Sequence, residues 1–292
     1  MNKTCQSEFG KLETVFIKQV KDAFVSDDVL EKQWQEHQFL SKPDFSGACR
    51  EYAAFEKLLK QDDCVIHNFP FNTKVSIDSI YCRDAALCTD QGVIICAMGK
   101  EARRNEPAAE ELYFGQLGIP VLGRIESPGT VEGGDVAWLD RKTLAVGHTY
   151  RTNPEGIRQL KALLEPSGIQ IIVVPLPHYR GPSDVFHLMS ILSPVDHNLA
   201  VVYSPLMPIV FREELIRRGF GLVEVPEQEF DSMGCNVLAI APRKCVMTEG
   251  NPITQSRLEK AGCEVLTYSG NEISVKGGGG PTCLTRPLWR WV

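Results

Sequence analysis

Apolar and polar residues follow one another in a unit that recurs five times along this chain. Each unit begins with apolar residues at helical spacing, continues through a polar or glycine-containing turn, and ends in a short β-branched run. The paired helical and strand-like segments cover residues 48–61 and 64–67, 108–117 and 119–122, 154–164 and 169–174, 211–218 and 222–225, and 253–261 and 263–266. This recurrence predicts repeated β/α modules rather than two unrelated domains.

The turns and the intervening segments support the same unit. Further strand-like runs lie between successive units at residues 92–96, 143–146 and 199–202, and four turns carry a glycine: Gly118, Gly168, Gly219 and Gly262. No Pro/Ser-rich linker or run of charges marks a boundary, so we expect residues 1–292 to form a single α/β domain. Helix-then-strand alternation also suits a doubly wound sheet, and the pattern alone leaves both architectures open.

Composition and charge narrow the class of protein. With 292 residues, 43% of them apolar and 23% charged, the chain can bury a substantial core. Its formal net charge is -6 and its Lys and Arg residues never run beyond pairs, so nucleic acid and membranes are not expected partners. The first thirteen residues hold no apolar leader region, and the longest apolar stretch, at 169–176, is too short to span a bilayer. We expect a cytoplasmic protein and leave its oligomeric state open.

One cysteine stands apart from the rest. The ten cysteines are scattered along the chain without the spacing of a zinc site, so we expect most of them to be small buried side chains. Cys283, however, ends the run Lys276-Gly-Gly-Gly-Gly-Pro-Thr-Cys, nine residues before the C-terminus. Successive glycines let a ligand or another segment approach the main chain closely. Cys283 is therefore the leading nucleophile candidate, and a flexible glycine-rich tail is the alternative.

Two acidic segments lie beside apolar strands. Asp78 and Asp84 are six residues apart, which on an extended strand would place both carboxylates on one face, an arrangement that suits a cation. Glu132 stands directly before Gly133-Gly134-Asp135, a turn that can direct its carboxylate into a cleft. On spacing alone, a strand-end turn with solvated aspartates and a plain hairpin turn remain alternatives.

Arginines and one histidine complete the candidate set. Arg103 and Arg151 offer guanidinium groups that can clamp a substrate carboxylate, although surface arginines are usually only solvated. His187 lies inside an apolar run of strand character, where a satisfied core histidine is the alternative. The Gly-x-Gly-x-x-Gly and Gly-Lys-Ser/Thr loops of dinucleotide and phosphate sites are missing, so neither cofactor class is predicted.

Taken together, these segments resemble the guanidine-modifying superfamily of arginine deiminases, dimethylarginine dimethylaminohydrolases and amidinotransferases. The resemblance spans residues 78–283, and six short elements occur in the family's order: Asp84 in Arg-Asp, Arg103 in Ala-Arg-Arg-x-Glu, Glu132 in Glu-Gly-Gly-Asp, Arg151 in Gly-x-x-x-Arg-Thr, His187 in Phe-His-Leu and Cys283 in the glycine-rich element. It implies a five-bladed α/β propeller (pentein) of pseudo-fivefold ββαβ modules, in agreement with the five units counted above.

The resemblance also implies a role for each matching residue. Cys283 corresponds to the nucleophile and His187 to the general acid and base. Asp84 and Glu132 correspond to the binders of the guanidinium, and Arg103 and Arg151 to the binders of the amino acid carboxylate. The last of the carried-over residues, Asp78, matches an aspartate near the α-amino group. No metal and no organic cofactor are implied.

The chemistry of a guanidine explains why such residues are needed. Its central carbon is a poor electrophile, so a thiolate must attack it and the leaving amine must be protonated. A free thiol with a pKa near 8.5 is mostly protonated at neutral pH, whereas a cationic substrate and an imidazolium favour the thiolate. We therefore expect a covalent thiouronium intermediate, which water converts into a ureido product, citrulline when the substrate is an arginine.

Subfamily features are mixed in this chain. Cys82-Arg83-Asp84 and the Gly-rich cysteine element look closer to arginine deiminases, whereas the length and His187-Leu-Met-Ser look like dimethylarginine dimethylaminohydrolases. Arginine deiminases carry an aspartate where this chain has Met189. Without that carboxylate an unsubstituted guanidinium N–H goes unpaired, which costs about 1–3 kcal/mol, while a thioether tolerates methyl groups. The sequence thus favours an N-methylated arginine.

Other functions remain open from the sequence. Arginine deiminase or arginine dihydrolase activity on free arginine is the first alternative, and amidinotransferase activity is the second. A non-catalytic binding protein on the same fold is the third. Such a protein would not need the intact set of Asp84, Glu132, His187 and Cys283, so the presence of that set counts against it. Residues 16–28 are either a mobile flap over the site or an ordinary connection.

Overall fold

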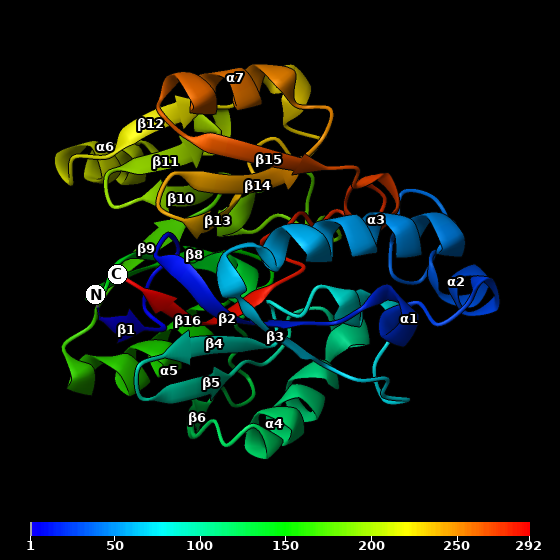
Figure 1. The fold of residues 1–292 in the computed structure, drawn as a ribbon. Coiled ribbons are helices and arrows are strands. Elements are labelled where there is room, and N and C mark those ends of the chain that lie inside the picture. Colours follow the sequence, from blue (N-terminus) through cyan, green and yellow to red (C-terminus); the bar gives the residue numbers. More distant parts are fainter. Residues whose placement is uncertain (1) are drawn as a thin grey trace.

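The computed structural model describes residues 2–292, and the strands of this part of the chain form five small sheets (Figure 1). One sheet has four strands in the order β1 (Lys3–Thr4), β16 (Arg286–Trp291), β2 (Lys11–Ile17) and β3 (Val65–Asn68). The others have three strands each: β4 (Ala86–Thr89), β5 (Gly92–Ile95) and β6 (Val121–Arg124); β7 (Val136–Asp140), β8 (Thr143–His148) and β9 (Gln170–Pro175); β10 (Leu192–Asp196), β11 (Leu199–Val202) and β12 (Gly221–Glu224); β13 (Leu238–Ala241), β14 (Lys244–Thr248) and β15 (Glu264–Tyr268).

Every sheet repeats the same connection. An antiparallel pair is followed by a helix and then by a strand that returns parallel to the second one, as in β4, β5, helix α4 (Glu106–Gln116) and β6. The equivalent helices of the other sheets are α3 (Phe45–Leu59), α5 (Pro154–Leu164), α6 (Ile209–Arg217) and α7 (Pro252–Lys260). The predicted α/β class and the five helix-strand units are confirmed.

The turns between helix and strand explain the spaced glycines. Gly118, Gly168, Gly219 and Gly262 all have left-handed backbone angles, with φ between 68° and 85°. A residue without a Cβ adopts that conformation without strain, so the chain can reverse sharply from each helix into the next strand. In the first module Asp63 takes the same role with φ 63°.

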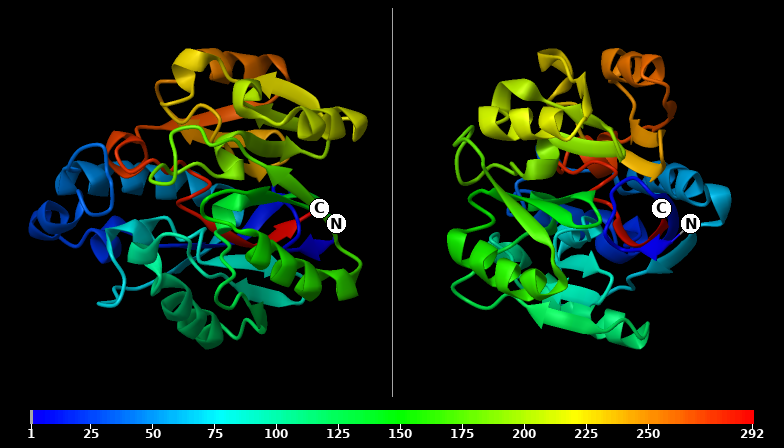
Figure 2. Two further views of the ribbon diagram at one scale, coloured as in Figure 1. Left: turned by 180° about the vertical axis from the view of Figure 1, so that it is seen from behind. Right: turned by 90° about the vertical axis from the view of Figure 1, so that its left-hand side faces the viewer.

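The two ends of the chain belong to one sheet. The C-terminal strand β16 lies between β1 and β2, and the amide of Asn2 donates to the carbonyl of Val292 at 2.8 Å. Figures 1 and 2 show the two termini side by side. Because β16 is anchored between two N-terminal strands, the glycine-rich run that precedes it is held in the interior rather than left to fray.

Apolar side chains fill the space between sheets and helices. For example, Leu160 and Leu164 of α5 pack against Trp138 and Val146 of the neighbouring strands, and all four are at most 2% exposed. The longer helices lie on the outside of the molecule (Figure 2), so each covers its own sheet with an apolar face. Within residues 2–292, no helix combines the length and apolar character needed to cross a bilayer.

Two predictions of strand structure are wrong. Residues 78–84 are not extended, because a 3-10 turn, Ile77–Ile80, is followed by further turns before β4. The two aspartates therefore do not share the face of a strand. His187 also lies outside any strand, in a loop that leads into the 3-10 turn Leu188–Ser190. In both places apolar residues are buried by a compact turn rather than by sheet pairing.

Residues 16–28 form an ordinary packed connection rather than a flap. The segment contains the end of β2, the short helix α1 (Val20–Ala23) and the start of α2 (Asp27–Gln33). Phe16, Ile17 and Phe24 are fully buried. Even the amine of Lys18 is internal, where it donates to the carbonyl of Pro70 at 2.9 Å.

Candidate active site

Three segments that are distant in sequence meet at the turn that contains Arg83 and Asp84. The amide of Arg83 donates to the carbonyl of Cys283 at 3.3 Å. The carbonyl of Asp84 accepts from the amide of Gly133 at 2.8 Å, and its carboxylate oxygen Oδ1 accepts from the amide of Gly134 at 2.8 Å. The predicted acid, the Glu132 turn and the predicted nucleophile are thus joined by backbone hydrogen bonds.

Gly133 and Gly134 are required for this close approach. A Cβ on Gly133 would lie 2.1 Å from the carbonyl oxygen of Arg83, and one on Gly134 would lie 2.4 Å from Nδ1 of His187. Both distances are shorter than any real contact, so larger residues would push the two segments apart. The glycines after Glu132 therefore bring its carboxylate to the histidine.

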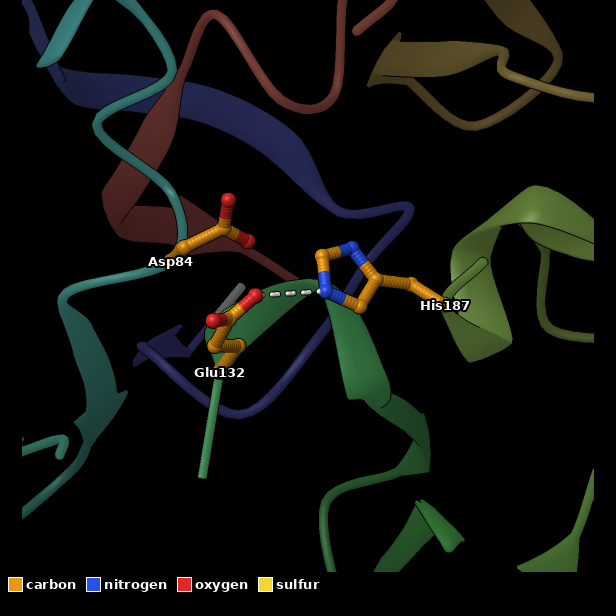
Figure 3. Close-up of side chains that lie close together, drawn as sticks. All are labelled: Asp84, Glu132 and His187. Carbon is orange, nitrogen blue, oxygen red and sulfur yellow. Dashed lines mark hydrogen bonds and ion pairs between the residues drawn. The ribbon is translucent and has the colours of Figure 1, made fainter. Parts of the chain in front are cut away.

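Glu132 and His187 form a buried ion pair. Nε2 of His187 lies 2.8 Å from Oε2 of Glu132, and Asp84 is beside them (Figure 3). Burial opposes the charge on His187, but Asp135, Glu132 and Asp84 outweigh it and raise the pKa of the imidazole to about 9. Burial likewise opposes the charge on Glu132, yet His187 and Arg151 hold the pKa of Glu132 well below its ordinary value. The pair is therefore imidazolium and carboxylate at neutral pH.

Asp135 stabilises this ion pair through the segment that carries His187. Its carboxylate accepts from the hydroxyl of Thr149 at 2.6 Å and from the amide of Leu188 at 3.0 Å, next to His187. Burial raises the pKa of Asp135 to about 6, despite the nearby imidazolium and these hydrogen bonds. Asp135 thus both fixes the 3-10 turn that carries His187 and adds negative charge near its ring.

Arg103 is held by protein groups on several sides. Nε donates to Glu106 at 3.0 Å, Nη2 to Glu106 at 2.7 Å and to the carbonyl of Tyr81 at 2.9 Å, and Nη1 to Asp84 at 2.6 Å. In this structure Arg103 positions Asp84. Arg151 is engaged more loosely, with Nη1 3.4 Å from Oε1 of Glu132. The expectation that both bind a substrate carboxylate stays a prediction.

Asp78 belongs to a second charged group at the edge of the site. Its Oδ2 lies 2.6 Å from Nζ of Lys100 and 3.0 Å from Nδ1 of His37. Burial disfavours the charge, but His37 and Lys100 lower the pKa of Asp78 to about 2. The amide of Lys100 also donates to Glu132 at 2.9 Å, which links this group to the ion pair.

The glycine-rich run packs so tightly that it fixes Cys283. A Cβ on Gly277 or Gly279 would overlap the ring of Tyr81, and one on Gly280 would lie 2.5 Å from the side chain of Asn236. Asn236 accepts from the amide and the hydroxyl of Thr282 at 3.0 and 2.8 Å, and its Nδ2 lies 3.4 Å from Sγ of Cys283. These contacts show that the glycine-rich run is tightly packed, as predicted, and is not a loose tail.

The thiol of Cys283 is half-buried and sits in a negative field. Burial, followed by the charge of Asp84, raises the pKa of the Cys283 thiol, although Thr282 and Asn236 act in the opposite direction. Without a bound cation the thiol is therefore protonated at neutral pH. A positively charged ligand in contact with Asp84 and Glu132 would offset the field and favour the thiolate.

Two cavities meet at Cys283. The first, called here the charged cavity, measures about 20 Å³ and is lined by Asp78, Tyr81, Asp84, Lys100, Arg103, Glu132, Arg151, Val185, His187, Cys283 and Gly277–Gly279. The second, the large cavity, measures about 360 Å³, and its wall includes Met189, Phe186, Phe230 and Asn236. Val185, His187, Gly277, Gly278 and Cys283 line both. Met189 lines the large cavity and not the charged cavity, so the argument from its thioether stays a prediction.

The cluster of Asp84, Glu132 and His187 also has the spacing of a metal site. One ligand atom from each lies within 4.8 Å of the other two. However, Arg103 pairs with Asp84 and Arg151 with Glu132, so guanidinium groups already supply positive charge to both carboxylates. The donor set is better matched to a planar cation with several N–H groups, which can share hydrogen bonds with the carboxylates.

The structure brings all seven predicted residues to the charged cavity or its wall, and it adds residues that the sequence did not single out. His37 and Lys100 hold Asp78, Glu106 holds Arg103, and Asn236 contacts the thiol. The partners His37 and Asp78 are 41 residues apart, so no local pattern could pair them. Asn236 offered a weak signal as a polar residue between Cys235 and an apolar run.

Comparisons with known proteins find relatives along most of this chain. The family model described as N,N dimethylarginine dimethylhydrolase, eukaryotic, matches residues 20–290. The N(G),N(G)-dimethylarginine dimethylaminohydrolase of Pseudomonas aeruginosa is 31% identical and covers 84% of this chain and 90% of its own. An arginine deiminase of Mycoplasma capricolum is 27% identical over 92% of this chain and 76% of its own.

A solved structure extends the likeness to three dimensions. It is a mutant of the Pseudomonas aeruginosa dimethylarginine dimethylaminohydrolase in complex with citrulline, with a TM-score of 0.77 and 28% identity. It covers 94% of this chain and 98% of its own. With matching fold, matching motifs and a family model that covers nearly its full length, this chain belongs to the N,N-dimethylarginine dimethylhydrolase family within the guanidine-modifying superfamily.

Proposed function

We propose that this protein hydrolyses an N-methylated arginine to citrulline and an alkylamine, as a hydrolase of C–N bonds in linear amidines. The observation that carries the proposal is the junction at Cys283, where a thiol, an imidazolium and two carboxylates surround one point. Family membership and the names of the most similar relatives support the same reaction.

Binding of the substrate would exchange one guanidinium for another. Asp84 and Glu132 are paired with Arg103 and Arg151 in the structure, and a substrate guanidinium would take over part of these hydrogen bonds. Its charge also offsets the field that keeps the thiol protonated, so the Cys283 thiol loses its proton as the substrate binds. The nucleophile is thereby formed only when a cation is in place.

The first half of the reaction forms a bond to sulfur. The Cys283 thiolate attacks the central carbon of the guanidinium and gives a tetrahedral adduct. The imidazolium of His187, held by Glu132, then gives its proton to the methylated nitrogen, and the C–N bond breaks to release methylamine or dimethylamine. A thiouronium remains on Cys283, and His187 is left neutral.

The second half restores the enzyme. Neutral His187 takes a proton from water while the water oxygen attacks the thiouronium carbon. The C–S bond then breaks, the hydroxyl proton of the adduct passes to the departing sulfur, and the ureido carbonyl of citrulline forms beside the free thiol. The overall change is one water consumed and one C–N bond hydrolysed, with no oxidant and no cofactor in the balance.

The far end of the substrate would lie against Asp78 and Arg151. An amino acid end carries one positive and one negative charge, and Asp78, Lys100 and Arg151 supply the complementary charges on one side of the thiol. In this role Arg151 is the better placed arginine, because its contact with Glu132 is longer than the contacts of Arg103. Arg103 would act mainly by holding Asp84.

Arginine deiminase activity is the second candidate. Similarity to an arginine deiminase over 92% of this chain favours it, whereas Met189 weighs against it, because a thioether is a much weaker acceptor for a guanidinium N–H than a carboxylate. Amidinotransferase activity and a non-catalytic binding role have no comparable observation behind them.

We further propose that the five sheets are the blades of a five-bladed α/β propeller and that residues 1–292 form one domain around it. All five sheets contain an antiparallel pair followed by a parallel pair, and this shared order supports the first point; one of the sheets has β1 as an additional strand. The shared sheet of β1, β2 and β16 supports the second, because it joins both ends of the chain.

A product assay tests the proposed reaction. Purified protein is supplied with arginine, monomethylarginine, asymmetric dimethylarginine and agmatine, and citrulline, ornithine, ammonia and alkylamines are measured. Citrulline with methylamine or dimethylamine is the expected result. Citrulline with ammonia from arginine as the faster reaction would instead establish a deiminase and remove the Met189 argument.

A further inference from the structure

Three arginines that the proposed reaction does not use are buried in the interior. Arg83 and Arg290 are fully buried, and Arg286 is 3% exposed. Nη2 of Arg286 donates to the carbonyl of Arg83, and Nη1 of Arg290 donates to the carbonyls of Gly10 and Ala239 at 2.6 and 2.8 Å. These three side chains, called here the arginine cluster, connect β16 to the turn before β4 and to β13.

Glu8 is the carboxylate that pairs with the arginine cluster. Its Oε2 accepts from Nη2 of Arg83 at 2.7 Å, and its Oε1 accepts from the amide of Trp138 at 3.3 Å. Both carboxylate oxygens are therefore in use. Among residues 2–292, Glu8 is the only acid that forms an ion pair with the cluster, so three positive charges face one negative charge.

The three guanidinium groups act on one another and on this carboxylate. Burial lowers the pKa of Arg290 to about 10, Glu8 opposes this shift, and Arg83 adds to it. Burial and the charge of Arg83 also lower the pKa of Arg286, and Glu8 again acts in the opposite direction. Arginine stays protonated at neutral pH, so the cluster carries its full charge there.

Much of the hydrogen-bonding capacity of the cluster is unused. Nε and Nη1 of Arg83, Nε of Arg286, and Nε and Nη2 of Arg290 are buried and have no hydrogen-bond partner in the described part of the chain. A buried N–H without a partner costs about 1–3 kcal/mol, and a buried charge without a counter-charge costs more. A group that accepts hydrogen bonds and carries negative charge would remove both costs.

The buried acid Glu110 does not fill this role. Its side chain is fully buried, and neither of its carboxyl oxygens has a hydrogen-bond partner within the described residues. Burial, followed by the charge of Glu106, raises the pKa of Glu110 well above its ordinary value, although Arg286 acts in the opposite direction. A protonated carboxyl group brings no negative charge, so the cluster remains positive.

We infer that the arginine cluster is a binding site for a small monovalent inorganic anion, for which chloride is the probe. Water could accept hydrogen bonds from these N–H groups, but it would leave their charge uncompensated. An anion does both, and the near-complete burial of the three side chains favours a small ion over an organic acid. This inference does not depend on the proposed hydrolase function.

The place of the cluster indicates what the anion would stabilise. Arg83 directly precedes Asp84, and a Cβ on Gly133 would lie 2.5 Å from Nη2 of Arg286. The cluster thus lies against both turns that carry the acidic residues of the charged cavity. Its role is structural, so the readouts are the position of the ion and the stability of the protein rather than turnover.

Crystals grown with bromide in place of chloride locate the ion directly. Anomalous scattering from bromine is expected to give a peak at hydrogen-bond distance from unpaired nitrogens of at least two arginines of the cluster. Ordered water molecules at these nitrogens without a bromine peak would overturn the inference.

Thermal unfolding measures the same site in solution. Chloride replaces gluconate stepwise at constant ionic strength, and the unfolding midpoint is expected to rise and then saturate. Because the ion binds the folded state, the rise is expected to reach about 5–10 °C when chloride exceeds its Kd about 100-fold. A midpoint that does not respond, or that rises linearly without saturation, contradicts a specific site.

Two variants change the charge of the cluster in opposite directions. Arg290→Met removes one guanidinium and is expected to abolish the response of the midpoint to chloride. Glu8→Gln removes the competing carboxylate and is expected to lower the chloride concentration at half-response. Arg104→Met, at an exposed arginine, is the matched control and should respond like the unmodified protein. Equal responses in all four proteins overturn the inference, and if neither variant folds, the bromine peak in the unmodified protein decides it.

Discussion

The two sides of Cys283 differ in the interactions that their side chains make. On the charged side, side chains from loops between different strands hold each other by short ion pairs, and Asp84, Glu132 and His187 have few degrees of freedom left. On the large side, the apolar side chains of Phe186, Met189 and Phe230 share the cavity wall with polar and charged side chains. The comparison teaches that the groups suited to the proposed chemistry gather on the charged side, whereas the large side offers open space next to the same thiol.

Removal of the nucleophile tests whether turnover depends on the Cys283 thiol while substrate binding does not. Cys283→Ser is expected to lower turnover by at least about 10³-fold, because serine lacks a thiolate and no thiouronium can form. Substrate binding is expected to persist, since the carboxylates of the charged cavity are untouched. Amine release and calorimetry measure the two effects. Retained turnover would place the chemistry elsewhere.

Neutralising Glu132 breaks the charged side alone. Glu132→Gln is expected to lower kcat/KM by about 10²- to 10³-fold, because the guanidinium loses a charged partner and His187 loses its ion pair. The same change is expected to lower the pKa of His187 from about 9, which NMR titration of the ring resonances reports. Asp140→Asn, on the distant end of β7, serves as a control for loss of one carboxylate. An unchanged pKa of His187 would contradict the assigned ion pair.

Stability against pH measures the same ion pair without substrate. The folded state raises the pKa of His187 to about 9, so the stabilisation is fully present below the unfolded pKa of about 6.5 and is lost as pH rises through about 9. Urea unfolding of the protein and of His187→Gln should differ more at about pH 6 than at about pH 9.5, by on the order of 2 kcal/mol. A difference that is independent of pH would mean that folding leaves the pKa of His187 unchanged.

The smallest expected effect concerns Asn236, which reaches the thiol from the wall of the large cavity. Asn236→Asp keeps an acceptor for Thr282 but replaces the N–H near Sγ by negative charge. The pKa of Cys283 is expected to rise, and kcat/KM at neutral pH to fall about tenfold. The pH dependence of alkylation by iodoacetamide reports the thiol. Asn236→Ala, which removes both contacts, separates loss of the loop contact from added charge, and equal reactivity in all three proteins would remove Asn236 from the site.

The seven residues predicted from the sequence line one cavity, and each lies in a short local element. Glu132-Gly-Gly-Asp and the glycine run before Cys283 are patterns in which the backbone itself needs glycine, and the structure places a neighbouring segment against each of these glycines except Gly278. The five helix-strand units were visible for the same reason, since helical spacing and turn glycines are local properties.

The sequence was less informative where distant segments decide the outcome. Asp78 and Asp84 were expected on one strand face, but a 3-10 turn separates them, and their partners Lys100, His37 and Arg103 come from other parts of the chain. The contact of Asn236 with Cys283 spans 47 residues. A pairing of this kind depends on which loops the sheets bring together. It cannot be predicted from the hydrophobic periodicity of the sequence.

By itself, then, the sequence determined the α/β class, the repeated unit and the candidates for the reactive residues, because local backbone preferences and short motifs encode them. Only the tertiary structure decided that a small charged cavity and a larger one meet at the same thiol, and that Met189 lines the second. The reason is physical: a cavity is the space that several packed segments leave between them, so it is not a property of any one of them.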